Sequence, residues 1–225
     1  MSRSRSRPPT PQQPSLSPTP VAAAAPPEES QRRSERRIAI TEAAVKQFAA
    51  HGYADCDMEC VAAKAGIGKG TLYLYFAGKQ ELFFACVDLG MKQMQAAVNT
   101  AAERETEPFQ KIDRAIRAYL EFFDSHPEYV ELLIQERAIF RDRVRPTYFE
   151  HRDANRGPWR KLYADLAASG LIRTDVPIER LLDTISSLVY GTMFTNHFIG
   201  RTITLDEQHR TILAVFLRGI APEGR

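Results

Sequence analysis

The 225-residue sequence has few cysteines and no long apolar run. Three cysteines in a chain of this length do not form the framework of a small disulfide-stabilised secreted protein, so a reducing cytoplasm is the expected location. No apolar stretch approaches the ~18 residues that a membrane-spanning helix requires. The apolar run at 21–25 is also too short for a signal peptide, whose apolar region needs ~7–15 residues. We therefore expect a cytoplasmic protein that does not insert into a membrane.

Patterns typical of β-strands are also lacking. No segment alternates apolar and polar residues with a period of two, whereas apolar residues recur at three- and four-residue steps along most of the chain. The predicted fold class is therefore all-α, with about nine helices bounded by glycine and proline signals. Helices are expected at about 30 or 34 to 52, 55 or 57 to 65, 68–76, 79–103, 108–125, 127–140, 146–169, 177–199 and 205–220.

Excess charge is scarce as well, because the net charge is only +2. Overall charge therefore does not identify a nucleic-acid-binding protein. Its distribution is more informative: residues 31–80 carry eight Lys and Arg against five Asp and Glu, whereas residues 81–225 carry nineteen against twenty-one. Positive charge is thus weighted toward the N-terminal third, as expected if that third faces phosphate.

The first thirty residues contain more than half of the prolines and no aromatic residue. Such a segment cannot bury enough apolar surface to offset the entropy of ordering it, so we predict a disordered tail. One interpretation is an inert extension. In the other, Arg3, Arg5 and Arg7 form a basic arm that strengthens DNA binding or enters a minor groove.

The most informative stretch is Asp57–Lys79, DMECVAAKAGIGKGTLYLYFAGK. It is predicted to form two short helices separated by a turn in which Gly66 adopts a positive φ. Gly68 can be the N-cap of the second helix, whose Leu72 and Phe76 lie four residues apart on the core side. A short exposed helix with cationic, hydroxyl and aromatic groups suits the major groove of DNA. The residues expected to point outward are Lys69, Thr71, Tyr73, Leu74 and Tyr75.

The segment 52–82, GYADCDMECVAAKAGIGKGTLYLYFAGKQEL, resembles the TetR family of transcriptional regulators, because its glycines, aromatic residues and lysine recur at the spacing of that family. The resemblance covers about residues 34–94, and beyond about residue 95 it is only architectural. It implies a homodimer with an N-terminal helix-turn-helix and a helical C-terminal domain that binds a small molecule.

The resemblance also implies roles for individual residues. Carried over by position, one group meets base edges or sugars, and these residues are Lys69, Gly70, Thr71 and Leu74. A second group meets phosphates or thymine methyl groups, and these residues are Tyr73, Tyr75 and Lys79. Asp57 stands where the family commonly has a threonine or serine that caps the helix and touches phosphate. Aspartate caps equally well, but its charge repels phosphate.

On this interpretation the chain has three parts. Residues 1–30 are the tail, residues 31–80 form the helix-turn-helix domain with its motif at about 57–76, and residues 81–225 bind the effector and the second copy. The predicted function is sequence-specific transcriptional regulation, most simply by a repressor that binds a palindromic operator as a dimer and is released by a ligand. The alternative is a helical protein-interaction module on the same scaffold without operator binding.

Aromatic and methionine side chains in the C-terminal part suit a partly hydrophobic small-molecule effector, although the same spacing also occurs in plain cores. The candidate effector residues are Phe84, Met91, Met94, Tyr119, Phe122, Phe123, His126, Tyr129 and Leu133. The last two helices are apolar over more than one face, which predicts either a four-helix interface between two copies or a buried hairpin in a monomer. The candidate interface residues are Leu181, Ile185, Leu188, Val189, Thr192, Met193, Leu213, Phe216 and Leu217.

No pattern in the sequence predicts an enzyme, a cofactor or a metal site. The glycine-rich run 66–71 is similar to a P-loop, but Ala63 stands where that motif needs glycine and Gly70 where it needs serine or threonine. No G-x-S-x-G or comparable signal indicates a nucleophile. Cys56 and Cys60 lie one helical turn apart near His51, but zinc ligands are usually closer in sequence and need a fourth group. Both cysteines are expected to be small buried apolar residues.

Overall fold

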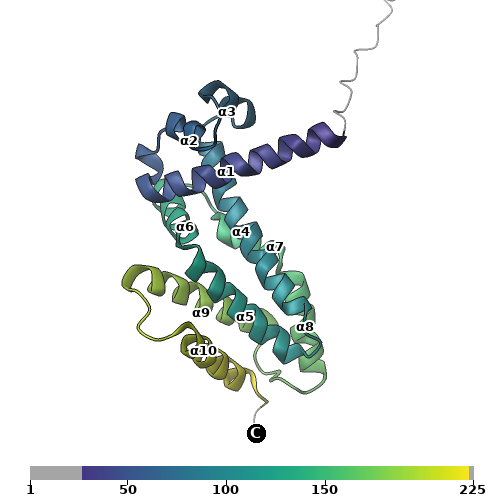
Figure 1. The fold of residues 1–225 in the computed structure, drawn as a ribbon. Coiled ribbons are helices and arrows are strands. Elements are labelled where there is room, and N and C mark those ends of the chain that lie inside the picture. Colours follow the sequence, from purple (N-terminus) through teal and green to yellow (C-terminus); the bar gives the residue numbers. More distant parts are fainter. Residues whose placement is uncertain (1–26, 223–225) are drawn as a thin grey trace, which may run out of the picture.

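A computed structural model gives the structure of residues 27–222. This part of the chain consists of helices and loops, without a strand, so the predicted all-α class is confirmed (Figure 1). None of the helices in residues 27–222 combines the length and the apolar character that crossing a membrane requires. The helices of this part are α1 Pro27–Asp55, α2 Met58–Lys64, α3 Lys69–Tyr75, α4 Lys79–Glu103, α5 Pro108–Ser125, α6 Pro127–Ile139, α7 Thr147–Ala154, α8 Arg156–Ala168, α9 Ile178–Ile199 and α10 Leu205–Ile220.

The helix α1 begins earlier than predicted. Its first residue is Pro27, and Glu28 and Glu29 lie in its first turn. Proline at the first helical position and acidic residues in the first turn both favour a helix start, so residues 27–30 are helical and do not belong to a disordered tail. Residues 1–26, including the arginines of the predicted basic arm, lie outside the described residues.

The predicted helix over 146–169 is instead two helices, α7 and α8, which raises the number in the described part from about nine to ten. The interruption lies at Asn155, whose φ of −100° and ψ of 10° depart from helical values. Pro158 explains it, because its ring clashes with the carbonyl four residues earlier, at Ala154, and it has no N–H to donate. α4, α5 and α10 have the predicted bounds.

The N-terminal helices pack around the start of α4. Phe48 of α1, Val61 of α2, Leu72 of α3 and Phe83 of α4 are all fully buried. α1 is interrupted at Gly52, where φ is +77°, a conformation that glycine adopts without steric cost. The interruption lets the chain fold back, so that the Tyr53 ring stacks on Phe48 with 6.0 Å between the ring centroids.

α4 links the two ends of the molecule. It runs from the α1–α3 end into the remaining helices (Figure 1) and packs on α1 and α6 as well as on α5 and α7. Gly90 permits its close approach to α6, because a Cβ atom at this position would lie 2.2 Å from Cδ1 of Tyr129. The Tyr129 hydroxyl also donates to Oε1 of Gln93 on α4, at 2.9 Å.

Candidate functional site

The turn between α2 and α3 is fixed by local hydrogen bonds. The Asp57 carboxylate caps α2 by accepting from the Glu59 N–H at 2.8 Å, as predicted for this position. At the other end Gly66 has φ +66°, its N–H donates to the Ala63 carbonyl at 3.1 Å, and the Ile67 N–H donates to the Ala62 carbonyl at 3.0 Å. These bonds form a Schellman motif, which ends α2 and sets the direction of the next helix.

α3 is a seven-residue helix with Gly68 at its N-cap and two inward anchors. Leu72 is fully buried and Phe76 is 1% exposed, as the four-residue spacing predicts. The opposite face projects away from the rest of the molecule (Figure 1). Its exposed residues are Lys69, Gly70, Thr71, Tyr73 and Leu74. Tyr73 is 46% exposed and Leu74 is 72% exposed, so this face offers apolar surface to a partner.

The C-terminal end of α3 is held by arginines of α1, which the sequence motif does not include. Arg33 donates from Nη2 to the Leu74 carbonyl at 3.2 Å, and Arg37 donates from Nη1 to the Tyr75 carbonyl. The Arg37 guanidinium also lies 4.0 Å from the centroid of the Phe76 ring. Basic groups suit a helix C-terminus, where carbonyls are left without partners. In the sequence, this role could have been recognised from the spacing of Arg33 and Arg37, which lie four residues apart on one face of α1.

Glu81, in the first turn of α4, completes this cluster. Its carboxylate accepts from the Ala77 N–H at 2.7 Å and from Nη2 of Arg37 at 3.1 Å. The Ala77 hydrogen bond and then that of Arg37 lower the pKa of Glu81 from its ordinary value of 4.5. The cluster therefore connects the end of α3 to both α1 and α4.

The two lysines of the motif differ in their surroundings. Lys69 forms an exposed ion pair with Glu59 at 3.3 Å. The Glu59 hydrogen bond and charge raise the pKa of Lys69, so it remains an ammonium, and an exposed pair is weak enough to be exchanged for another anion. Lys79 is half-buried, donates to the Ala54 carbonyl at 2.7 Å and lies 5.1 Å from the Tyr53 ring centroid. Tyr75 is likewise half-buried.

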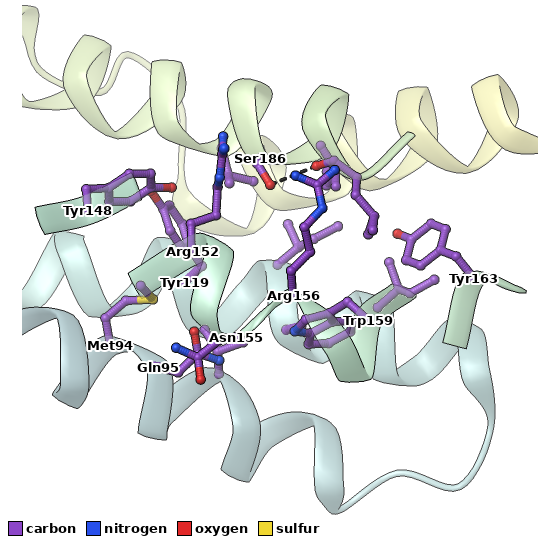
Figure 2. Close-up of a pocket in the computed structure, with 17 residues that line it drawn as sticks. Met94, Gln95, Tyr119, Tyr148, Arg152, Asn155, Arg156, Trp159, Tyr163 and Ser186 are labelled. Carbon is purple, nitrogen blue, oxygen red and sulfur yellow. Dashed lines mark hydrogen bonds between the residues drawn. The ribbon is translucent and has the colours of Figure 1, made fainter. Parts of the chain in front are cut away.

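A cavity of about 150 Å³ lies between α4, α5, α7, α8 and α9 (Figure 2). Of the nine predicted effector residues, only Met94 and Tyr119 line it. Five of the others are buried in the core, namely Met91, Phe122, Phe123, Tyr129 and Leu133. Phe84 packs against Phe140, and His126 stacks on Phe122. The structure therefore does not bring the nine residues together around one space.

The polar lining of the cavity comes mostly from α7 and α8, which the sequence reasoning did not select. The hydroxyls of Tyr119 and Tyr148 lie 3.0 Å apart. Burial raises the pKa of Tyr119 and raises that of Tyr148 to about 12, so both phenols are neutral at physiological pH. Arg152 and Arg156 also line the space and extend toward α9 (Figure 2).

The faces of α9 and α10 divide the predicted interface residues into two sets. Leu181, Val189, Met193 and Phe216 are buried, because this side of the two helices packs on α5 and other parts of the same protomer. These four residues are therefore already covered within the protomer. The remaining residues are half-buried, and they are Ile185, Leu188, Thr192, Leu213 and Leu217.

The cysteines also differ from expectation in part. Cys56 and Cys86 are buried, but Cys60 is exposed because it lies on the outward face of α2, opposite Val61 and Ala62. Burial raises the pKa of the Cys56 thiol. Within residues 27–222, no three His, Cys, Asp or Glu side chains gather in a group that could hold a metal ion.

Two known family domains match most of the described chain. Residues 40–86 match the family described as "Bacterial regulatory proteins, tetR family", and residues 108–216 match the "Tetracyclin repressor-like, C-terminal domain". The two matches follow one another along the chain and together cover more than two thirds of its length.

Individual relatives agree with these family matches. The HTH-type transcriptional regulator YhgD of Bacillus subtilis is 37% identical over 92 residues, which are 41% of this chain and 48% of YhgD, so the chain spans about half the length of this relative. The HTH-type transcriptional repressor KstR2 of Mycobacterium tuberculosis is 23% identical over 85% of this chain and 96% of KstR2.

Among solved structures, the fatty acid degradation regulator FadR from Bacillus halodurans has a similar fold, with a TM-score of 0.71 and 16% identity over 82% of this chain and 95% of FadR. The two family matches cover the α2–α3 turn and then α5 to α9, in the order that the structure shows. The protein belongs to the TetR family of bacterial regulatory proteins.

Proposed function

We propose that this protein is a DNA-binding transcriptional regulator, most simply a repressor, that binds an operator as a homodimer and releases it when a small molecule occupies the cavity. The observation that carries the proposal is the exposed face of α3, where Lys69, Thr71, Tyr73 and Leu74 stand on the buried anchor Leu72. The repressor KstR2, which is similar over most of its length, supports the direction of regulation. The protein acts on DNA in the cytoplasm, and the proposal involves no catalysis.

The geometry of α3 suits insertion into a major groove. The groove admits one α-helix, and recognition helices contact base edges mainly through their N-terminal residues. Lys69 and Gly70 occupy that end, where the ammonium and the free backbone N–H groups favour a phosphate or a guanine edge. Tyr73 offers an apolar ring face to a thymine methyl group and a hydroxyl to the backbone. Asp57 lies exposed beside this face, and we propose that it acts as a cap and does not contact phosphate.

The proposed division of labour places DNA binding in residues 31–80 and the effector and dimer surfaces in the following part of the chain. Two copies would pair through the outward sides of α9 and α10, where Leu188, Thr192, Leu213 and Leu217 are half-exposed and Val215 is 64% exposed. A two-fold axis there would present two α3 helices, which must match successive major grooves ~34–36 Å apart.

Selection of bound DNA from a random pool tests the proposal directly. Purified protein should enrich a palindrome with half-sites about one helical turn apart. Absence of enrichment at low salt would refute operator binding and favour the alternative of a protein-interaction module on the same scaffold.

Two substitutions on α3 sharpen the test. Lys69→Ala should weaken binding to all sequences and reduce the slope of log affinity against log salt by about one unit. Tyr73→Ala should cost about 1–3 kcal/mol on the selected operator, the range of a lost base contact. Lys161→Ala is the matched control, because Lys161 is an exposed lysine of α8 and lies far from α3 in the sequence. It should leave the operator affinity and the salt slope unchanged. Wild-type affinity in both α3 variants would refute the docking.

A further inference from the structure

The wall of the cavity is mostly apolar. Side chains of α4, α5 and α9 form it, among them Met94, Val98, Ile116, Ile185 and Val189, together with Trp159 of α8. An apolar wall favours an apolar part of a ligand, because filling the space removes apolar surface from water and restores dispersion contacts. This part of the site alone does not select for charge.

The charged groups on the wall are all of one sign. Arg152 and Arg156 line the cavity, and among its lining residues, all of them described, no aspartate or glutamate occurs. Both side chains are shielded from solvent, with exposed fractions of 27% for Arg152 and 12% for Arg156. Charges in such surroundings act over short distances more strongly than on an open surface. The lining therefore favours an anionic group.

Nearby carboxylates offset the charge of Arg156 but only part of that of Arg152. Asp153 pairs with Arg152 at 2.8 Å and also with Arg145 at 3.0 Å, so this group keeps one positive charge in excess. In a separate group, two arginines are matched by two carboxylates, and its members are Arg156 and Arg160 with Glu179 and Asp183.

Arg156 is held at the wall of the cavity by contacts with α9. Its Nη1 donates to Asp183 at 2.7 Å, its Nη2 donates to the Glu179 carbonyl at 2.5 Å, and its Nε lies 2.9 Å from the Glu179 carboxylate. The guanidinium is therefore fixed in place beside the cavity.

The volume of the cavity sets the size of the ligand part that it can enclose. A volume of about 150 Å³ is that of a cavity that takes benzene and lies well below the ~300–1,000 Å³ of sites for drug-sized ligands. We propose that the cavity binds a monocarboxylate whose apolar part is about the size of one aromatic ring, with the carboxylate held by Arg152 and Arg156. This inference rests on the proposed function, since it gives the chemical class of the effector.

Binding to the full chain without DNA tests the class. Phenylacetate, phenylethanol and phenylethylamine share a ring and differ in the charge of the end group. Calorimetric titration should show binding of phenylacetate, at least about tenfold weaker binding of the alcohol, and no binding of the amine, because only the carboxylate carries a charge opposite to that of the arginines. Equal binding of alcohol and carboxylate, or no binding of either phenylacetate or hexanoate at millimolar concentration, would overturn the proposal.

Variants assign the effect to the arginines. Arg152→Gln should weaken phenylacetate binding about tenfold and weaken phenylethanol binding distinctly less, as expected for loss of a charged partner. Lys161→Gln removes an exposed charge of α8 that belongs neither to these ion pairs nor to the lining, so it is the matched control and should show wild-type binding. Arg156→Lys keeps the positive charge and one donor near α9. We therefore expect it to weaken phenylacetate binding less than Arg152→Gln does. Unchanged phenylacetate binding in Arg152→Gln and Arg156→Lys would refute the assignment.

A second measurement separates this inference from the proposed function. The selected operator is titrated with protein in the presence and absence of phenylacetate. Carboxylate binding without operator release would support the ligand class and refute ligand-controlled release. Operator binding without any carboxylate binding would leave the regulator standing and refute the ligand class.

Discussion

Replacing Arg37 by alanine should weaken operator binding although no contact to DNA is removed. Arg37 donates to the Tyr75 carbonyl at the end of α3, pairs with Glu81 at 3.1 Å and covers the Phe76 ring at 4.0 Å. α3 has only seven residues, and a helix of that length is unstable by itself. Its orientation therefore depends on the residues that anchor it, and Arg37 anchors its C-terminal end.

The magnitude follows from the exposure of the side chain. A hydrogen bond to a charged group contributes about 1.5–3 kcal/mol when shielded from water. The Arg37 side chain is 42% exposed, so solvent screening reduces its polar contacts to about 1 kcal/mol. The contact with the Phe76 ring adds about 0.5–1 kcal/mol. Because these contacts share one side chain and are not independent, we expect Arg37→Ala to lower the free energy of unfolding by about 1–2 kcal/mol.

Urea unfolding and operator titration test this expectation together. Operator affinity should fall because a less firmly anchored α3 spends less time in the binding orientation, by at most about fivefold to thirtyfold, the factor that corresponds to 1–2 kcal/mol. The slope of log affinity against log salt should stay at the wild-type value, since a lost phosphate contact would change it by about one unit. Arg36→Ala, at the exposed neighbouring position, is the control and should retain wild-type stability. Wild-type stability of Arg37→Ala, or a reduced salt slope, would refute the positioning role.

Three further outcomes are expected from urea unfolding. Gly90→Ala should lower the free energy of unfolding by about 1–3 kcal/mol, because the new Cβ would overlap the Tyr129 ring. The gain in helix propensity offsets ~1 kcal/mol of this loss. Wild-type stability would contradict the close approach of α4 and α6. Glu136→Gln should cost about 1–2 kcal/mol, since the neutral amide loses the charge that pairs with Arg143 at 2.8 Å. The Ala77 N–H and Arg37 lower the pKa of Glu81, so the Glu81 carboxylate stabilises the folded state above pH 4.5. This stabilisation is lost as the pH falls through the lowered pKa. The stability difference between wild type and Arg37→Ala should shrink accordingly in acid, and a constant difference would exclude the pair.

The α2–α3 unit could be predicted because its determinants are local. Gly66 has the predicted positive φ, Asp57 has the predicted cap, and Leu72 and Phe76 have the predicted burial. Each depends on residues fewer than ten positions away, so the spacing alone carries the information. Arg37 was missed because its partner Tyr75 lies 38 residues along the chain.

The cavity could not be predicted because five helices form it. Met91 and Met94 differ by one helical turn, yet Met91 is fully buried in the core and Met94 lines the cavity. Helical spacing identifies an inward face, but it does not indicate whether a neighbouring helix fills the space opposite. For α8, the break at Asn155 determines how the helix lies against the cavity. The break results from Pro158, which the predicted single helix over 146–169 did not take into account.

α4 is the element through which a ligand in the cavity would act on α3. Met94 lines the cavity, and Lys79 lies fifteen residues earlier at the other end of the same helix, about 22 Å away. Over that length a tilt of about 5° displaces the far end by about 2 Å. The Glu81–Arg37 pair joins this end to α3, so a displaced α4 would carry the recognition helix with it. Since two such helices must match grooves ~34–36 Å apart, a shift of this size in each copy would move both helices relative to the grooves. Loosening the pair by Arg37→Ala should therefore also reduce the effect of the ligand on operator affinity.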